Sequence, residues 1–316
     1  MTAGSAATGA VTGTGAAMSS AATPVADERI APETEVFHVD ALGSSVLWVR
    51  RDTDDQYRVA LATAGGPARD LSPQSFDDLD AKLGADSSGR LVVAYRRCTE
   101  DGQCGLYRLE LGSGRETPLA THRPNGCTDD HPVVARSRVV FGRTCTGPVG
   151  SGVFALKGDK VRRILRLDGD RVTAIDSDGA QVAAVASDAR ASTVRVARID
   201  GSRAATIFTS AAQAGIDVTL GSLTIASGTV TWMYHGEGEN TTDGAIYRAR
   251  AKRGATCTRE YRRFSTDLTH GTLSPAELMG VGVGSGGLYY GVTQSGIFRA
   301  VKPAVAFAAV GCRLAG

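Results

Sequence analysis

The chain has 316 residues, of which 42% are hydrophobic and 6% aromatic, enough apolar material for a packed core. It carries 35 Lys and Arg against 33 Asp and Glu, and a formal net charge of +2 argues against a strong field for nucleic acid or an anionic membrane. No RNP-like motif, zinc knuckle or basic-aromatic stripe occurs, and no apolar run approaches the ~18 residues of a membrane span. We therefore expect no nucleic-acid partner and no transmembrane helix.

Residues 1–35 differ in composition from the rest of the chain. They are mostly Ala, Gly, Thr and Ser, with no aromatic residue and no Lys. Such a segment cannot bury enough apolar surface to offset its ordering entropy, so it is expected to be a disordered tail. A degenerate secretory signal is the alternative, with small residues at 20–22 or 24–26 as cleavage candidates. The folded domain is expected over 36–316.

From residue 36 onward the chain repeats a unit made of strands. Hydrophobic strands align on Trp48, Tyr95, Phe141, Val185, Trp232 and Tyr289, with steps of 47, 46, 44, 47 and 57 residues. A period of this length in an all-strand unit is typical of a propeller blade. The sequence therefore predicts an all-β fold, a six-bladed β-propeller of four-stranded antiparallel blades. We expect a strand near 35–42 to close the ring by pairing with the last blade, because an open ring leaves two exposed edges.

A third strand and a turn recur in each repeat. In the second repeat, alternation over 106–111 stops at Gly112-Ser113-Gly114 and then resumes, which is the pattern of a hairpin. The aromatic residues at equivalent third-strand positions are Tyr57, Tyr107, Phe154, Tyr247 and Phe298. One aromatic per repeat at one register indicates a core between blades rather than a cofactor site, and no cofactor is expected.

These repeats resemble the TolB-like six-bladed propellers, whose units carry an aromatic strand, a D-G-G or similar turn and a closing Arg-x-Leu-Thr/Ser. The matching residues are Tyr57, Gly65, Gly66, Arg69, Leu71 and Ser72 in the first repeat, and Tyr107, Gly114 and Leu119 in the second. The segments 86–89 and 176–179 stand where the Asp-Gly turn belongs, and the resemblance covers roughly residues 36–310. The resemblance supports the propeller fold strongly and the function only weakly, because propellers serve both binding and catalysis.

Six cysteines favour an oxidising compartment, so we expect an extracytoplasmic protein, secreted or periplasmic. They fall into three candidate pairs: Cys98–Cys104, Cys127–Cys145 and Cys257–Cys312. The first pair flanks a hairpin loop, and the second joins the start of a first strand to the end of its second strand. The third follows by elimination, although strand counting places its members at opposite blade ends. Free buried thiols are the alternative, and the spacings do not fit a zinc site.

Catalytic motifs are absent, including a GxSxG elbow, HExxH and a P-loop. The glycine-rich run 280–287 fits a close-packed inner strand better than a phosphate loop, because it lacks a Lys and a following helix. The histidines lie in separate repeats or loops, so a metal site would have to assemble across blades, as in propeller lactonases. Asp129, Asp130 and His131 form the best candidate cluster, with a solvated loop as the alternative; no metal is assigned.

Charge is divided between the two ends of the predicted ring. Loops between second and third strands carry a net charge of −7, and the turns between third and fourth strands carry +6. An electrostatic potential that differs between the two ends steers a partner of opposite charge to one of them. The alternative is that these charges serve only solubility. We expect a protein partner, through a basic segment, or a small cationic ligand on the acidic loop face of a monomer. A long loop over 235–245 supplies its candidate residues: His235, Glu237, Glu239 and Asp243.

Two functions from different classes remain. One is a non-catalytic extracytoplasmic binding or scaffold propeller. The other is a metal-assisted hydrolase or lyase with its site at the mouth of the central channel. The inner-strand segments HPVVARS, RVTAIDS, SLTIAS and LMGVGVG predict a channel lined mostly by small and apolar residues, which favours the first. Three or more converging carboxyl, amide or imidazole groups would favour the second.

Overall fold

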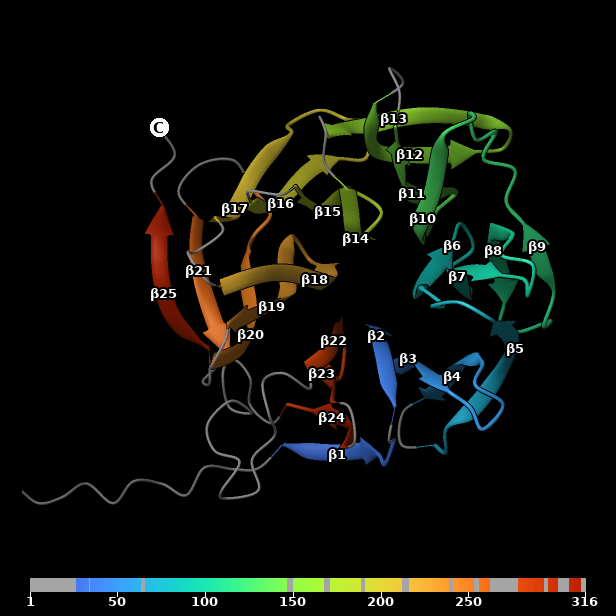
Figure 1. Ribbon diagram of the computed structural model, residues 1–316, viewed down its shortest axis with the longest axis horizontal. Helices are drawn as coiled ribbons and strands as arrows, with labels where there is room; N and C mark the ends of the chain where they lie inside the picture. Colours follow the sequence, from blue (N-terminus) through green and yellow to red (C-terminus); the bar gives the residue numbers. More distant parts are fainter. Residues whose placement is uncertain are drawn as a thin grey trace, which may run out of the picture.

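The computed structural model consists of β-strands arranged in a ring around a central axis (Figure 1). It describes residues 27–33, 35–63, 66–146, 150–167, 171–188, 191–211, 216–238, 241–252, 256–261, 278–292, 295–300 and 307–313. Over these ranges the structure confirms an all-β, propeller-like arrangement with blades of four antiparallel strands. The described part of the chain contains no helix long and apolar enough to cross a membrane. The proposed cleavage positions near 20–26 lie outside the described residues.

The sheets follow chain order around the ring. The first contains β2 (Val36–Leu42), β3 (Ser45–Arg51), β4 (Tyr57–Thr63) and β5 (Arg69–Ser75). An eight-stranded sheet combines β6 (Ala81–Asp86), β7 (Leu91–Cys98), β8 (Cys104–Glu110) and β9 (Glu116–Pro118) with β10 (Cys127–Arg136), β11 (Arg138–Cys145), β12 (Ser151–Lys157) and β13 (Lys160–Leu167). Its two halves are each antiparallel and join only through a parallel pairing of β6 with β10, Ala85 opposite Ala135 and Asp86 opposite Arg136.

Three further sheets complete the described fold. One contains β14 (Arg171–Ser177), β15 (Gln181–Ser187), β16 (Ala191–Arg198) and β17 (Ala205–Ala211). The next contains β18 (Ile216–Ala226), β19 (Thr229–Gly238), β20 (Thr241–Arg250) and β21 (Thr256–Tyr261), with β25 (Ala308–Arg313) as a fifth strand. The last contains β22 (Leu278–Gly284), β23 (Gly287–Val292), β24 (Gly296–Arg299) and β1 (Glu28–Ala31).

The axis is lined by β2, β6, β10, β14, β18 and β22, which contact one another in this order, and β22 contacts β2 again (Figure 1). Glycine residues on β22 allow the close contact between β22 and β2. A Cβ on Gly280 would lie 2.5 Å from the backbone nitrogen of Val39, and one on Gly282 would lie 2.5 Å from that of Ala41. The interpretation of 280–287 as a close-packed inner strand is therefore confirmed.

Ring closure uses an earlier segment than the sequence predicted. β1 pairs antiparallel with β24 through Glu28 opposite Arg299 and Arg29 opposite Phe298, so the prediction that 35–42 closes the ring is wrong. The reason is burial. Val36 and Val39 on β2 are fully buried and suit a strand at the axis, whereas only the last residue of β1 is buried and the rest suits an outer edge.

Stacked aromatic pairs form the core of several blades, as the repeat predicted, except that in the last blade Tyr290 takes the position assigned to Tyr289. Second-strand aromatic residues are fully buried and stack on third-strand ones: Tyr95 on Tyr107 (5.8 Å between ring centroids), Phe141 on Phe154 (6.0 Å) and Tyr290 on Phe298 (5.5 Å). Two buried aromatic residues donate hydrogen bonds to carboxylates. Tyr290 Oη donates to Asp27 (2.7 Å), and Trp48 Nε1 donates to Glu33 (3.0 Å).

Candidate functional site in the central channel

The channel contains ionisable side chains, which corrects the expectation of a mostly small and apolar lining. Asp40 on β2, Lys82 on β6 and Asp176 on β14 are buried, with exposed fractions of 3%, 6% and 7%. The expectation rested on later inner strands and overlooked the first two, VFHVDAL and AKLGAD, where Asp40 and Lys82 stand. The residues were visible in the sequence, but their meeting across the ring was not.

Lys82 spans the channel. Its Nζ donates a hydrogen bond to the carbonyl of Leu223 on β18 (2.7 Å), across the axis from β6 (Figure 1), and lies 3.6 Å from Asp40 Oδ1. The two carboxylates bond to the backbone of the next inner strand. Asp40 Oδ2 accepts from the Leu83 amide and Asp176 Oδ2 from the Ile225 amide, both at 2.7 Å. These contacts satisfy buried donors that would otherwise lack partners, and they join the blades.

Two carboxylates therefore share one ammonium group in a buried setting. Burial raises the pKa of Asp40 to about 7, against the opposing effect of Lys82, and the charge of Asp176 adds to the rise. Burial also raises the pKa of Asp176. Burial alone would lower the pKa of Lys82, but the charges of Asp40 and Asp176 outweigh it and raise that pKa. Lys82 is thus held charged, and it stabilises at least one ionised carboxylate beside it.

Histidines lie at the channel mouth on the loop face, the end that carries the connections between second and third strands. His131 Nδ1 is 2.5 Å from Asp80 Oδ2, and its Nε2 is 3.1 Å from the carbonyl of Val172 on β14. His38 Nε2 is 3.2 Å from Asp78 Oδ2. Each imidazole joins segments from different blades. Burial opposes the charged form of His131, but the charge of Asp80 and their hydrogen bond outweigh it, so the pKa of His131 is raised.

This raised pKa predicts a pH-dependent stability. The contribution of the His131–Asp80 pair is fully present below the unfolded imidazole pKa of about 6.5 and is lost as the pH rises through the higher folded value. His131→Gln should lower the free energy of unfolding by about 1–3 kcal/mol at pH 6 and by less at pH 8.5. Urea unfolding at the two pH values measures this, with His122→Gln, at an exposed histidine, as the control. An equal loss at both values would contradict the assignment.

The predicted cluster of Asp129, Asp130 and His131 does not converge on one point. Asp129 forms a buried pair with Arg143, at 2.6 Å to Nε and 2.9 Å to Nη2. Asp130 instead meets Arg96 Nε at 2.7 Å, and burial raises its pKa. Each residue of the cluster thus has a separate partner: the Asp129–Arg143 pair lies within one blade, and the pairs of Asp130 and His131 join neighbouring blades.

The predicted acidic loop is mostly strand. β19 continues to Gly238 and β20 begins at Thr241, so His235 pairs with Gly244, and the backbones of Glu237 and Asp243 lie in the same hairpin. Glu239 lies outside the described residues. The long loop over 235–245 was therefore a wrong prediction.

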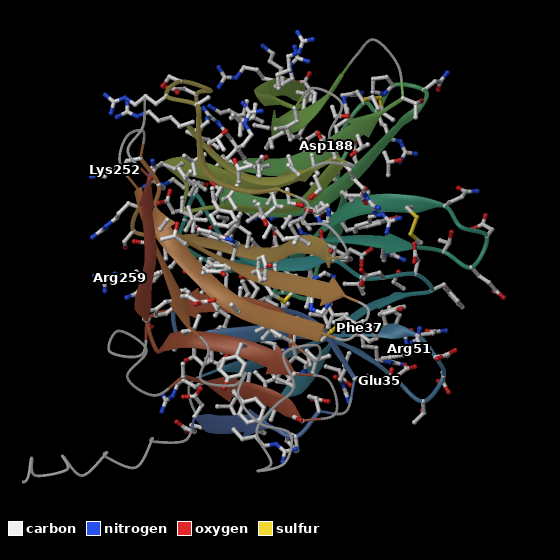
Figure 2. All side chains as sticks on the ribbon, turned by 60° about the vertical axis from the view of Figure 1, so that its left-hand side comes forward. Glu35, Phe37, Arg51, Asp188, Lys252 and Arg259 are labelled. Carbon is white, nitrogen blue, oxygen red and sulfur yellow. A yellow bond between two sulfur atoms is a disulfide. The ribbon has the colours of Figure 1, made fainter. Side chains whose placement is uncertain are left out.

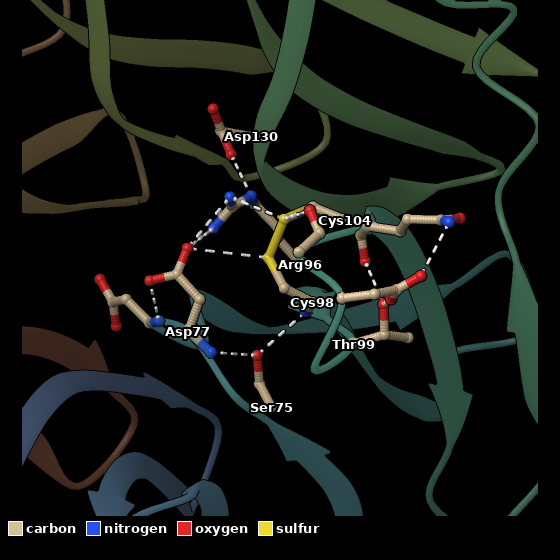
Figure 3. Close-up of a disulfide and its surroundings, with 11 residues drawn as sticks. Ser75, Asp77, Arg96, Cys98, Thr99, Cys104 and Asp130 are labelled. Carbon is tan, nitrogen blue, oxygen red and sulfur yellow. Dashed lines mark hydrogen bonds and ion pairs between the residues drawn. A yellow bond between two sulfur atoms is a disulfide. The ribbon is translucent and has the colours of Figure 1, made fainter.

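Two of the three predicted disulfides are present, both on the loop face. Cys98–Cys104 and Cys127–Cys145 have Cα separations of 4.0 and 4.1 Å. Figure 3 shows the first beside Arg96, which reaches Asp77 on one side and Asp130 on the other. Among the described residues, Asp77 with these two cysteines is the grouping nearest to a metal-ligand set, but its sulfurs are joined to each other and offer no thiolate.

A cavity of about 340 Å³ lies at the opposite end of the channel, on the turn face, which carries the turns between third and fourth strands. Asp40 and Asp176 contribute to its lining, with Ser177, Thr224 and Ser227. The channel thus has a polar cavity at its turn-face end. At its loop-face end it has two imidazoles, each paired with a carboxylate. Its charged groups bind each other or the backbone, an arrangement suited to holding blades together.

Comparison with solved structures places the chain among β-propeller proteins. No family model matches it, and no curated protein matches it in sequence. The Aleuria aurantia lectin, solved as a mutant with α-methyl-L-fucoside, is similar at a TM-score of 0.50 and 9% identity, covering 91% of this chain and 97% of the lectin. The β-propeller domain of the Pyrococcus furiosus Trilobed protease is similar at a TM-score of 0.44 and 10% identity, and the match covers 81% of this chain and 77% of that domain.

TolB from Acinetobacter baumannii gives a TM-score of 0.45 and 10% identity, over 65% of this chain. The chain spans 52% of that TolB and 61% of a TolB-type protein from Agrobacterium tumefaciens. At these identities the likeness concerns the fold alone. The class that fold and comparisons define is the β-propeller.

Proposed function

We propose that this chain is a six-bladed, TolB-like propeller that acts outside the cytoplasm as a non-catalytic binding or scaffold protein. The two antiparallel halves of the eight-stranded sheet count as separate blades, because only two residue pairs join them. Six inner strands contacting in a closed order support the same number. On this proposal the propeller domain extends from β1 to β25, so it begins before residue 36.

The observation that carries the functional part is the use of the channel's charged groups. Lys82 is engaged by Asp40 and the Leu223 carbonyl, and His131 by Asp80 and the Val172 carbonyl. Groups bound in this way hold the ring together and leave recognition to the surface loops. The two disulfides on the loop face support an oxidising location.

The loop face is the proposed recognition surface, for a basic protein segment or a small cationic ligand, in a monomer. Connections after second strands all emerge at this end, because strand direction alternates within each blade. They include the exposed residues Asp54, Asp55, Glu100 and Asp101. Arg51 from this face and Lys252 from the turn face lie at opposite sides of the molecule (Figure 2). The hairpin over 235–245 belongs to the same surface.

Neutralising that face should slow the association of a cationic partner. With octalysine as the probe, Asp54→Asn, Asp55→Asn, Glu100→Gln and Asp101→Asn together should lower the association rate roughly tenfold at low salt and flatten its salt dependence. The matched control is Asp159→Asn with Asp200→Asn, two exposed acids of the turn face. Stopped-flow measurement with equal rates for both variants would refute a sided recognition surface.

A third disulfide, Cys257–Cys312, is also proposed. The two residues are register partners in the antiparallel pairing of β21 with β25, the relation that Cys98 has with Cys104 and Cys127 with Cys145. Strand counting places these two cysteines at opposite ends of their blades. That argument fails because β25 pairs with β21 in the fifth blade. We expect that no thiol of the native protein reacts with iodoacetamide before reduction, and that peptide mapping recovers the 257–312 link. Alkylation of these two cysteines without reductant would contradict it.

The alternative function is a metal-assisted hydrolase or lyase at the loop-face mouth of the channel. His38, Asp78, Asp80 and His131 favour it, since they bring imidazoles and carboxylates from several blades to one mouth. Their existing pairings weigh against it, because each imidazole already has its own carboxylate. The two functions differ in whether this mouth retains a divalent ion.

A further inference from the structure

Cations without carboxylate partners, all exposed except the half-buried Arg138, gather on the turn face of the third and fourth blades. This set, named the basic track, consists of Arg136, Arg138, Lys157, Lys160, Arg162, Arg198 and Arg203. Among the described residues none of the seven lies within ion-pair distance of a carboxylate, and Arg162 donates only to a backbone carbonyl, that of Ile199 at 3.1 Å. Hydrogen bonds from Ser202, and after them the charges of Arg198 and Arg162, lower the pKa of Asp200, so the positive charge of the track is only partly offset.

Three arginines elsewhere in the described ring do pair with carboxylates. Arg50 pairs with Asp70 (2.8 Å), Arg90 with Asp86 (3.0 Å) and Arg115 with Glu110 (2.7 Å). Arg90 and Arg115 are also exposed, with 70% of each side chain accessible. Exposure alone does not prevent a guanidinium group from pairing with a carboxylate, so the lack of partners along the track depends on which side chains lie nearby.

The track is continuous across blades. A cavity of about 430 Å³ between the second and third blades is lined by Arg136 and Arg138 and reaches Gly158, in the turn that carries Lys157 and Lys160. From there β13 leads to the next blade, since Arg162 bonds to Ile199. The turn of Arg198 to Arg203 packs on β13, where a Cβ on Gly201 would lie 3.1 Å from the carbonyl of Ile164. In Figure 1 the blade of β12 and β13 neighbours that of β16 and β17, and β13 contacts β16.

Acidic residues do not cancel this charge. Asp86 and Glu110 in the cavity are already held by Arg90, Arg108 and Arg115. Asp200 accepts hydrogen bonds from the Ser202 amide and hydroxyl, at 2.8 and 2.6 Å, and caps its own turn. Asp159 is the other acid in the two turns. Asp178 lines the axial cavity with Arg136 and caps its own turn, so the seven cations face three nearby acids, Asp159, Asp178 and Asp200, over the described part of the track.

We propose that the basic track binds a linear anionic polysaccharide, with one anionic group seated in the cavity beside Arg136 and Arg138. Guanidinium groups bind sulfate, phosphate and carboxylate oxygens through paired hydrogen bonds, and lysines add point charges along the chain. The cavity lining contains no aromatic side chain on which a base could stack, which separates this surface from a single-stranded nucleic-acid site. This site is independent of the acidic loop face, at the other end of the ring.

Dextran sulfate is the probe, with unsulfated dextran as the reference polymer. Calorimetry over a salt series should give binding to the sulfated chain only, with affinity falling as salt rises. Arg136→Gln with Arg138→Gln, and Lys157→Gln with Lys160→Gln, should each weaken binding about tenfold and reduce the salt slope. Lys157→Arg with Lys160→Arg should retain it. The charge-matched control is Lys252→Gln with Arg259→Gln, two exposed cations of blade five (Figure 2) that should bind as the unmodified protein does.

Three results would overturn the proposal: no binding of dextran sulfate, an equal loss in the blade-five control, or tighter binding of poly-L-glutamate or duplex DNA than of dextran sulfate. The last would assign the track to an acidic protein or to nucleic acid instead. Thermal unfolding of each variant identifies any that fails to fold. If a Gln variant fails, the Lys157→Arg with Lys160→Arg variant, which keeps both charges, still tests the proposal. The acidic-face variants should bind dextran sulfate normally, so failure of one proposal is distinguishable from failure of the other.

Discussion

Replacing Lys82 by methionine should lower the free energy of unfolding by about 3–5 kcal/mol at pH 8, because the substitution leaves Asp40 and Asp176 buried without their shared cation. The loss should be smaller at pH 5. Asp40 already has a raised pKa of about 7, and removing the ammonium raises it further, so acid neutralises the carboxyl groups and relieves their repulsion. Urea unfolding at both pH values measures the difference.

Two further variants separate charge from packing in this experiment. Lys82→Met combined with Asp40→Asn should recover part of the loss at pH 8, since one buried charge disappears with the cation. Lys252→Met, at an exposed lysine, should change little. A loss that is identical at pH 5 and pH 8 and unaffected by Asp40→Asn would mean that Lys82 contributes only its apolar stem.

Removing the closing strand is the second change with a large expected effect. A chain beginning at residue 35 lacks β1, its pairing with β24 and the bond from Tyr290 to Asp27, and it exposes the edge of the last sheet. We expect a loss of about 3–5 kcal/mol, at roughly 1 kcal/mol for each hydrogen bond removed, and a tendency to associate through the open edge. Calorimetry and light scattering measure the two effects.

The matched control for this truncation is a chain beginning at residue 27, which keeps β1 and removes only the Ala-, Gly- and Thr-rich segment. Its unfolding should match that of the full chain. If both truncated chains were as stable as the full chain, β1 would not close the ring; a loss in the chain beginning at residue 27 would show that residues before 27 contribute.

The repeat made the blade predictable, because strand alternation and aromatic spacing are local properties of the sequence. Trp48, Tyr95 and Phe141 became core, and the two short-range disulfides formed where the hairpins placed them. β1 and β25 were not predictable in the same way. Both are short segments without regular alternation that add to sheet edges built by distant residues.

The channel was the main gap in the sequence-based account. Asp40, Lys82 and Asp176 stand in three different repeats, and Lys82 bonds to a carbonyl 141 residues away. No local pattern encodes such a contact, because it depends on which inner strands face each other across the axis. A charged residue at an inner-strand position in an otherwise apolar segment, as in VFHVDAL, was the available signal.

Metal content of the purified protein tests the central claim most directly. If the channel's charged groups serve to join blades, dialysis against Ca²⁺, Mn²⁺ or Zn²⁺ followed by plasma mass spectrometry should find no divalent ion retained in stoichiometric amount, and His131→Gln should not alter the result. One ion per chain that is lost with His131→Gln would contradict the account and favour a metal-assisted enzyme at the channel mouth.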